Sequence, residues 1–203
     1  DEEFTFYGRH VGGVVGRLSG DLAKAYNTGE IYNGYSTVGG IVGWWAAGDI
    51  KNVFNTGNIT VVNNDKENGV SQVGGIAGAH SGAQSELSYA YNLGTIRSFS
   101  PYGNQDNTDM PLRNAVGGII GYVRTYRGDD IGNNKKDSKL KIDNVYTTNN
   151  LFAAKDNGGN ATYTPTNEGL GAIYGRTDYA QFSIDNSYYV KMYESGFSDQ
   201  INL

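Results

Sequence analysis

Carboxylates at one recurring position are the residues of this chain best placed to do chemistry. Asp21, Asp49 and Glu86 each stand directly before an aliphatic residue that is followed, four positions later, by an aromatic one. If the repeated segments stack as strands, these carboxylates lie about 5–10 Å apart, a range that includes the carboxylate pairs of glycosidases. The same position holds Lys141 and Ser183 in later copies, and acids at strand edges are commonly solvated. We therefore expect no enzyme activity and keep a polysaccharide-processing hydrolase or lyase as the alternative.

Two adjacent tryptophans are the main aromatic candidates for ligand binding. Neighbouring side chains of an extended segment point to opposite faces, so one of Trp44 and Trp45 is expected to be buried and the other exposed. We expect the exposed ring to lie near Arg17 of the preceding copy and His80 of the following one. Ordinary packing is the alternative, because scattered surface aromatics are normal. Trp44, Trp45 and His80 are therefore candidate binding residues.

Metal sites have little support in the composition. The chain has no cysteine and only two histidines, His10 and His80, so disulfides, thiolate sites and the zinc-protease pattern His-Glu-x-x-His are absent from it. Asp106 and Asp109 lie in a loop rich in the oxygen ligands that calcium favours. Because the spacing matches neither an EF-hand nor a calcium-binding β-roll, we expect no cofactor and keep calcium at these two residues as the alternative.

All of these residues belong to a two-part pattern that occurs five times in 203 residues. Its first half, Val-Gly-Gly-hydrophobic-x-Gly, starts near residues 11, 38, 73, 116 and, in a degenerate form, 170. Its second half runs from an aliphatic to an aromatic residue at 22–26, 50–54, 87–91, 142–146 and 184–188. A recurring unit of this kind predicts one stacked repeat domain spanning residues 1–203.

The composition favours strands over helices. Glycine is abundant, with 30 residues against three prolines, and apolar positions lie too close together for a sustained helical stripe. The fold class predicted is all-β, a parallel β-helix or β-solenoid of about five rungs with long loops on one edge. We expect the aliphatic column to face the core and favour the same direction for the aromatic column, with the outer face as the alternative. Asn27, Asn55 and Asn92 should form an amide ladder at a corner. The second glycine column ends at Ala172, so it should need small size rather than a left-handed backbone.

The best copy of the pattern has a known counterpart. Val-Gly-Gly-Ile-Val-Gly at 38–43, followed by Ile-Lys-Asn-Val-Phe-Asn-Thr-Gly at 50–57, resembles the GLUG motif. This repeat occurs in large bacterial surface and secreted proteins, among them filamentous-haemagglutinin-type adhesins and the non-catalytic region of some immunoglobulin A proteases. The resemblance implies a β-helix or related solenoid, an extracellular or cell-surface location and a link to virulence. It carries over no catalytic residues, because the motif residues are structural.

The spacing between copies widens along the chain. Successive Val-Gly-Gly starts are 27, 35, 43 and 54 residues apart. The insertions, predicted as loops 60–72, 97–115 and 152–169, occupy the same place in the repeat, and insertions on one face of a repeat protein are often its binding face. Phe99, Tyr102 and Tyr163 within them are candidate binding residues, since aromatics beside polar groups suit sugar or protein recognition. Tolerated surface loops are the alternative, because long insertions cost little closure entropy. A second bulge is predicted at 122–141.

Charge and hydropathy narrow the choice of partners. A net charge of −5 and a pI near 5 disfavour nucleic acid, and no apolar stretch approaches the roughly 20 residues of a membrane span. The opening Asp1-Glu2-Glu3 suggests a fragment or processed product, so we expect flanking domains of a larger protein as neighbours. The sequence thus favours a non-catalytic adhesin segment that recognises a host or neighbouring-cell protein or glycan. A purely structural spacer in a surface filament is a further alternative.

Overall fold

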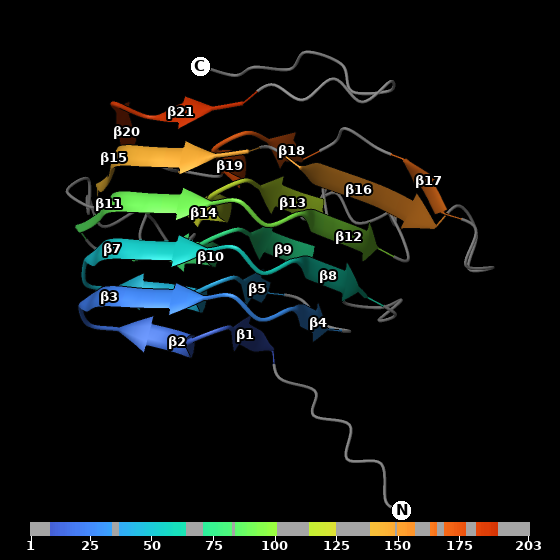
Figure 1. Ribbon diagram of the computed structural model, residues 1–203, viewed down its shortest axis with the longest axis horizontal. Helices are drawn as coiled ribbons and strands as arrows, with labels where there is room; N and C mark the ends of the chain where they lie inside the picture. The colour runs from blue at the N-terminus through green and yellow to red at the C-terminus, as the bar shows by residue number, and fades with distance from the viewer. Residues whose placement is uncertain are drawn as a thin grey trace, which may run out of the picture.

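The computed structural model describes residues 9–33, 37–63, 71–82, 84–100, 114–124, 139–148, 150–156, 163–165, 169–177 and 182–190. These residues form an all-β structure of four sheets, which we name A to D in chain order, and each of the first three repeats contributes one strand to each sheet (Figure 1). The fourth repeat contributes two strands to sheet D, and the fifth contributes two to sheet C and, among the described residues, none to sheet D. Within sheets A, B and C every pair of neighbouring strands is parallel. Such stacked parallel sheets are compatible with a β-helix.

The strands of each sheet come from successive repeats. Sheet A holds β1 (His10–Gly12), β5 (Thr37–Gly39), β9 (Ser71–Gly74), β13 (Asn114–Gly117) and β18 (Leu170–Gly171). Sheet B holds β2 (Val15–Ser19), β6 (Val42–Ala47), β10 (Ala77–Ser81), β14 (Ile120–Arg124) and β19 (Tyr174–Thr177). Sheet C holds β3 (Leu22–Asn27), β7 (Ile50–Asn55), β11 (Ser85–Asn92) and β15 (Leu140–Thr147), with β20 (Phe182–Asp185) and β21 (Tyr188–Tyr189) both pairing with β15. Sheet D holds β4 (Ile31–Asn33), β8 (Ile59–Val62), β12 (Ile96–Ser100), β16 (Leu151–Asp156) and an antiparallel β17 (Tyr163–Pro165).

Equivalent residues of the repeats lie directly opposite each other. In sheet A the valines that open each copy pair in register, Val11 with Val38 and Val38 with Val73. In sheet C the aliphatic residue of each second half does the same, as Leu22 does with Ile50. The predicted alignment of the five copies is therefore confirmed by the strand pairing.

Two apolar clusters fill the interior. One joins sheets B and C and includes Trp45, Ile50 and Leu87, and the other joins sheets A and D and includes Val38 and Ile59. All five side chains have no exposed surface. Stacking like residues over like residues thus buries a continuous core that no single repeat could form alone.

The glycines allow sheets A and B to approach each other at backbone distance. A Cβ on Gly39 would collide with the carbonyl of Val42, and a Cβ on Gly40 with the carbonyl of Gly75 in the next repeat. None of the glycines in these two columns has a positive φ. The prediction that the second column needs small size is therefore confirmed. Ala172 stands where sheet A, as described, has no strand beyond β18.

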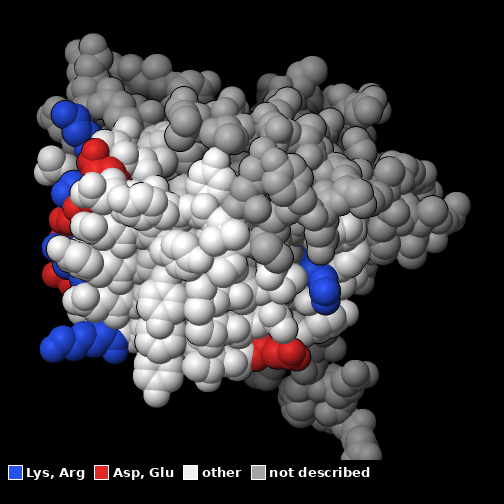
Figure 2. Space-filling model, turned by 45° about the horizontal axis from the view of Figure 1, so that its top comes forward, with Lys and Arg blue, Asp and Glu red and all other residues white. Residues whose placement is uncertain are grey.

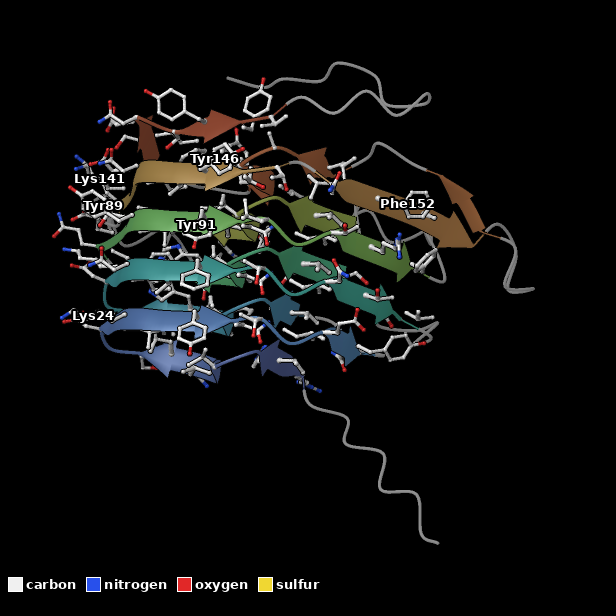
Figure 3. All side chains as sticks on the ribbon, in the orientation of Figure 1. Lys24, Tyr89, Tyr91, Lys141, Tyr146 and Phe152 are labelled. Atoms are coloured by element: carbon white, nitrogen blue, oxygen red, sulfur yellow. The ribbon has the colours of Figure 1, made fainter. Side chains whose placement is uncertain are left out.

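The aromatic column of sheet C faces outward, so the expectation that it lies in the core is wrong. Tyr26 is 62 % exposed, and its ring stacks on Phe54 at a centroid distance of 5.1 Å and an interplanar angle of 7°. Phe54 stacks in turn on Tyr91 at 4.9 Å and 2°. Figure 3 shows Tyr91 and Tyr146 standing one above the other on neighbouring strands. The aromatic rings thus form a ladder on the surface.

A left-handed residue in each repeat explains this reversal; four lie within strands of sheet C and the fifth, Asn186, lies between β20 and β21. Lys24, Asn52, Tyr89, Asn144 and Asn186 have φ between 46° and 57° and stand two positions before the aromatic residue. In an uninterrupted strand, residues four apart share a face. The left-handed residue shifts the alternation by one position, so that Val53 is buried and the following Phe54 lies on the outside. Asparagine tolerates a left-handed backbone, so the Asn residues of this column were the one feature of the sequence that could have indicated this conformation.

Candidate functional site

The tryptophan pair divides between the two faces of sheet B, as predicted. Trp45 has no exposed surface, and its indole Nε1 donates a hydrogen bond of 2.9 Å to the Gly48 carbonyl. Trp44 is only partly buried and pairs in register with Arg17 on the preceding strand. On the following strand its partner is Ala79. Trp44 and Arg17 therefore share the outer face of sheet B.

His80 does not join that surface, contrary to the prediction. It pairs in register with Trp45 rather than Trp44, and its ring meets the Trp45 ring edge to face with centroids 4.5 Å apart. The His80 side chain has no exposed surface, and neither ring nitrogen has a hydrogen-bond partner among the described residues. Desolvation in this apolar site lowers the pKa of His80 to about 4. His80 is therefore a neutral core residue at physiological pH.

The histidine that does contact the exposed tryptophan is His10. Its ring lies 5.0 Å from that of Trp44, and burial lowers its pKa, with Arg17 and Arg9 adding to the effect. His10 belongs to sheet A and Trp44 to sheet B, so strand register could not indicate the contact. The close approach that the glycines permit brings the two sheets together here.

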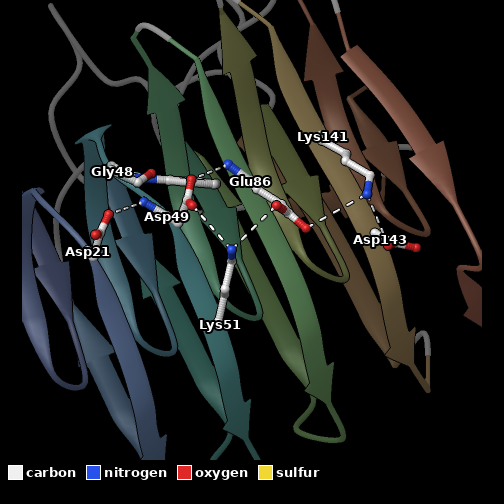
Figure 4. A network of polar contacts seen from close by, with 8 residues as sticks. Asp21, Gly48, Asp49, Lys51, Glu86, Lys141 and Asp143 are labelled. Carbon is white, nitrogen blue, oxygen red and sulfur yellow. Dashed lines mark hydrogen bonds and ion pairs between the residues drawn. The ribbon is translucent and has the colours of Figure 1, made fainter.

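The carboxylates at the start of sheet C link one repeat to the next. Asp21 Oδ1 accepts a hydrogen bond of 2.8 Å from the Asp49 amide, and Asp49 Oδ1 accepts one of 2.9 Å from the Glu86 amide (Figure 4). Lys51 Nζ lies between the last two, 3.3 Å from Asp49 Oδ2 and 3.5 Å from Glu86 Oε2. The predicted column of acids is thus present. Its carboxylates accept hydrogen bonds from backbone amides and form ion pairs with a lysine.

The same network continues into the later repeats. Lys141 Nζ lies 3.8 Å from Glu86 Oε1 and 3.2 Å from Asp143 Oδ2, and Asn186 Nδ2 donates to Asp143 Oδ1 at 3.1 Å. The Asn186 hydrogen bond and the Lys141 ammonium together lower the pKa of Asp143. Hydrogen bonding to their acidic neighbours raises the pKa of Lys51 and of Lys141. Acidic and basic side chains accordingly alternate along the left margin of the face drawn in Figure 2.

The predicted amide ladder is present at the corner after sheet C. Asn27 Nδ2 donates to Asn55 Oδ1, and Asn55 Nδ2 donates to Asn92 Oδ1, both at 2.8 Å. Each of these amides also donates to the carbonyl of the glycine two residues further on. Asn55 and Asn92 are fully buried, so the ladder satisfies polar groups where each chain turns toward sheet D.

The aromatic candidates of the insertions lie in different places. Phe99 belongs to β12 and is partly buried, with its ring 5.5 Å from that of Phe152 on β16. Tyr163 begins β17. Tyr102, Asp106 and Asp109 lie outside the described residues. The insertions are also shorter than predicted, because strands β8, β12 and β16 run into the ranges 60–72, 97–115 and 152–169.

Connection lengths differ sharply among the four corners. The A-to-B connection is always two residues long, and the C-to-D connection is always three, at 28–30, 56–58, 93–95 and 148–150. The D-to-A connection lengthens from 34–36 to 63–70 and then to 101–113, and the fourth, 157–169, contains strand β17. The B-to-C connection is short except at 125–139, within the predicted second bulge. The predicted insertions therefore share one corner of the repeat.

Within the described ranges, no group of three His, Asp or Glu residues is arranged to hold a metal ion. In the same part of the chain no helix is long and apolar enough to cross a membrane.

Comparison with known proteins identifies the repeat. A family model, the GLUG motif, matches residues 34–60, which run from the connection before β5 into β8. No curated protein and no solved structure matches the chain. The chain thus carries the GLUG motif at residues 34–60, and its five registered repeats are consistent with a GLUG-repeat region.

Proposed function

We propose that the chain is a single five-rung parallel β-helix segment of an exported bacterial surface protein. It acts as a non-catalytic scaffold that presents the D-to-A connections to a protein or glycan on a host or neighbouring cell. The GLUG match at 34–60 and the in-register parallel stacking of successive repeats support the scaffold.

The contrast in connection lengths carries this proposal. Two of the four corners keep their length in every repeat, whereas the D-to-A corner grows from three residues to thirteen. If the repeat only set a spacing, no corner would need to lengthen selectively. Long connections held by a rigid framework are typical recognition elements.

The framework is suited to holding such connections in fixed positions. Strands β8 and β9, which flank the connection 63–70, are buried at Ile59, Val61, Ser71 and Val73. Strands β12 and β13, which flank the connection 101–113, continue the same columns with Ile96 and Val116. Both connections therefore start and end on core strands rather than on mobile segments.

The polar network of sheet C favours the scaffold over the enzyme. A glycosidase needs one carboxyl group free to donate a proton and another free to attack or activate water. Asp49 instead accepts the Glu86 amide, and both side chains are paired with Lys51. These contacts support a role for the acids in holding the repeats together.

Binding to arrays of glycans and host surface proteins tests the proposal. The first variant replaces 101–113 with the three residues 34–36, and its control replaces 125–139 with the two residues 48–49. We expect the first variant to lose binding, the control to keep it, and both to retain the circular dichroism and unfolding transition of the wild type.

Three outcomes would contradict the proposal. If binding survives the simultaneous shortening of 63–70, 101–113 and 157–169, the ligand must contact another part of the protein. Absence of wild-type binding on every array would favour a purely structural spacer. Depolymerisation of a polysaccharide that Asp49→Asn abolishes without unfolding the protein would favour the enzyme.

A further inference from the structure

Tyrosines from three successive repeats form one column on the outer face of sheet C. Tyr91 on β11 pairs in register with Tyr146 on β15, and Tyr146 pairs in register with Tyr188 on β21. Neighbouring strands lie about 4.8 Å apart, and Figure 3 shows Tyr91 directly below Tyr146. The other described tyrosines have no tyrosine as a register partner. This column is therefore the one place in the described structure where strand pairing sets tyrosine opposite tyrosine.

Phenylalanine interrupts the column on its other side. Tyr26 stacks on Phe54, and Phe54 stacks on Tyr91, so the phenol of Tyr26 has no second phenol beside it on the neighbouring strand. Tyr89 is isolated too, because the corresponding positions of the neighbouring repeats hold asparagine. Tyr26 and Tyr89 are 62 % and 61 % exposed. The column thus differs from these tyrosines in having a phenol on the next strand rather than in exposure.

The column is open to reagents in solution. Tyr146 is 38 % exposed and Tyr188 is 67 % exposed, while Tyr91 is partly buried. A one-electron oxidant takes an electron from a phenol, which also loses its hydroxyl proton, and the resulting radical has unpaired density on the ring carbons ortho to the oxygen. Two such radicals held on adjacent strands couple without having to diffuse together, which favours their reaction over coupling between molecules.

We propose that this column is a site of oxidative cross-linking, at which a haem peroxidase with hydrogen peroxide joins Tyr146 to Tyr91 or to Tyr188. Each of the two phenols gives up one electron and one proton. The radicals form a carbon–carbon bond between their ortho positions, and the two ortho hydrogens move as protons to the phenol oxygens. Hydrogen peroxide takes up the two electrons and two protons and becomes two molecules of water. The product is a dityrosine that spans two repeats.

A cross-link at this position ties neighbouring repeats together. Contacts in a stacked fold join each repeat only to its neighbours, and the chain has no cysteine with which to form a disulfide between them. The bond between Tyr91 and Tyr146 closes the stretch that contains the long connections 101–113 and 125–139. Closing this stretch lowers the conformational entropy of the unfolded chain, so the cross-linked protein should be more stable.

Treatment of the dilute full chain with a haem peroxidase and hydrogen peroxide tests the proposal. We expect the monomer to gain dityrosine fluorescence and to lose the mass of two hydrogen atoms, and peptide sequencing to place the bond at Tyr146. Tyr146→Phe keeps the ring but removes the phenol, so its monomer should form about tenfold less dityrosine or lower still. Tyr26→Phe and Tyr89→Phe are the controls, because they remove exposed but isolated phenols and should keep the wild-type yield.

Phe54→Tyr provides a test by gain rather than by loss. Position 54 lies between Tyr26 and Tyr91, so a phenol introduced there should yield a new cross-linked peptide that contains position 54. Misfolding of the variant could not produce this result. The cross-linked wild-type monomer should also unfold at a higher urea concentration than the untreated protein.

The opposite outcomes overturn the proposal. A wild-type yield in Tyr146→Phe, or bonds mapped only to tyrosines outside the column, would show that register does not direct the coupling. Cross-links found only between separate molecules would exclude a bond between repeats, as would Phe54→Tyr without a peptide linked through position 54. An unchanged urea midpoint after cross-linking would show that the bond does not hold the repeats together. None of these readouts depends on the ligand in the proposed function.

Discussion

Lowering the pH should destabilise this protein through a single buried histidine. His80 packs edge to face on Trp45 and lies in register with Val123 on the next strand. The core column that contains these residues continues to Leu18 at one end and Thr177 at the other, so no charged side chain faces the ring from sheet B. Folding therefore requires the neutral imidazole, and a protonated ring would be an unpaired charge in the core.

The size of the effect follows from the pKa. In the unfolded chain His80 titrates near its ordinary value of 6.5, and in the folded chain near 4. Above pH 6.5 both states are neutral, and the contribution to stability is complete. Between 6.5 and 4 only the unfolded state binds the proton, so the free energy of unfolding falls as the pH falls. Each pKa unit is worth about 1.4 kcal/mol, so the loss amounts to about 3 kcal/mol.

Urea unfolding measured from pH 7.5 to 4 tests this account. His80→Leu removes the titrating group together with two ring nitrogens that have no partner among the described residues. We expect it to be at least as stable as the wild type at pH 7 and to show a smaller loss at pH 4 by about 3 kcal/mol. His10→Gln removes the other histidine and serves as the control, which should keep most of the wild-type slope.

A wild-type curve that runs parallel to that of His80→Leu between pH 6.5 and 4 would refute the reasoning. So would a strong loss of stability in His80→Leu at pH 7, because it would mean that the imidazole makes a favourable polar interaction in the core.

Three further predictions, which use five substitutions, test how the repeats pack. Gly40→Ala should cost about 3 kcal/mol in urea unfolding, since its Cβ would meet a carbonyl of the next repeat, whereas Gly20→Ala, with open space around it, should change stability by less than about 0.5 kcal/mol. Asn55→Ala should cost about 2–3 kcal/mol and Asn27→Ala about 1 kcal/mol, because the ladder is buried at the first and exposed at the second; equal losses would contradict this. Tyr89→Asn should raise stability by about 1 kcal/mol by relieving a φ of 54°, and a decrease would show that the exposed tyrosine ring has a stabilising role.

The register of the repeats could be predicted from sequence because its determinants are side chains of fixed spacing. Val38 and Val73 head equivalent segments, and like residues stack best on like residues. The amide ladder followed from the same alignment, since asparagine at a turn satisfies the backbone beside it. The shared corner of the insertions followed from counting residues between these markers.

The direction of each side chain could not be predicted so readily. Alternation places Leu22 and Tyr26 on one face, and only the left-handed backbone at Lys24 separates them. Lysine and tyrosine give little warning of such a conformation, although the asparagines of the same column do. The placement of His80 failed for a related reason. The alignment of Val38 with Val73 sets His80 opposite Trp45, but adjacent tryptophans point to opposite faces, and the alignment does not say which of them lies in the core.

In-register stacking of successive repeats is the claim on which the core, the ladders and the shared corner all rest. The chain has no cysteine, so Thr60→Cys with Arg97→Cys isolates one pair that lies directly opposite on β8 and β12. Neighbouring strands lie about 4.8 Å apart, within reach of a disulfide, whereas Thr60→Cys with Phe152→Cys spans two strand spacings and exceeds the roughly 7 Å limit. Under mild oxidation at high dilution, we expect the first pair to close an intramolecular disulfide and the second to keep free thiols. Free thiols in the first pair, or a ready disulfide in the second, would contradict the stacking.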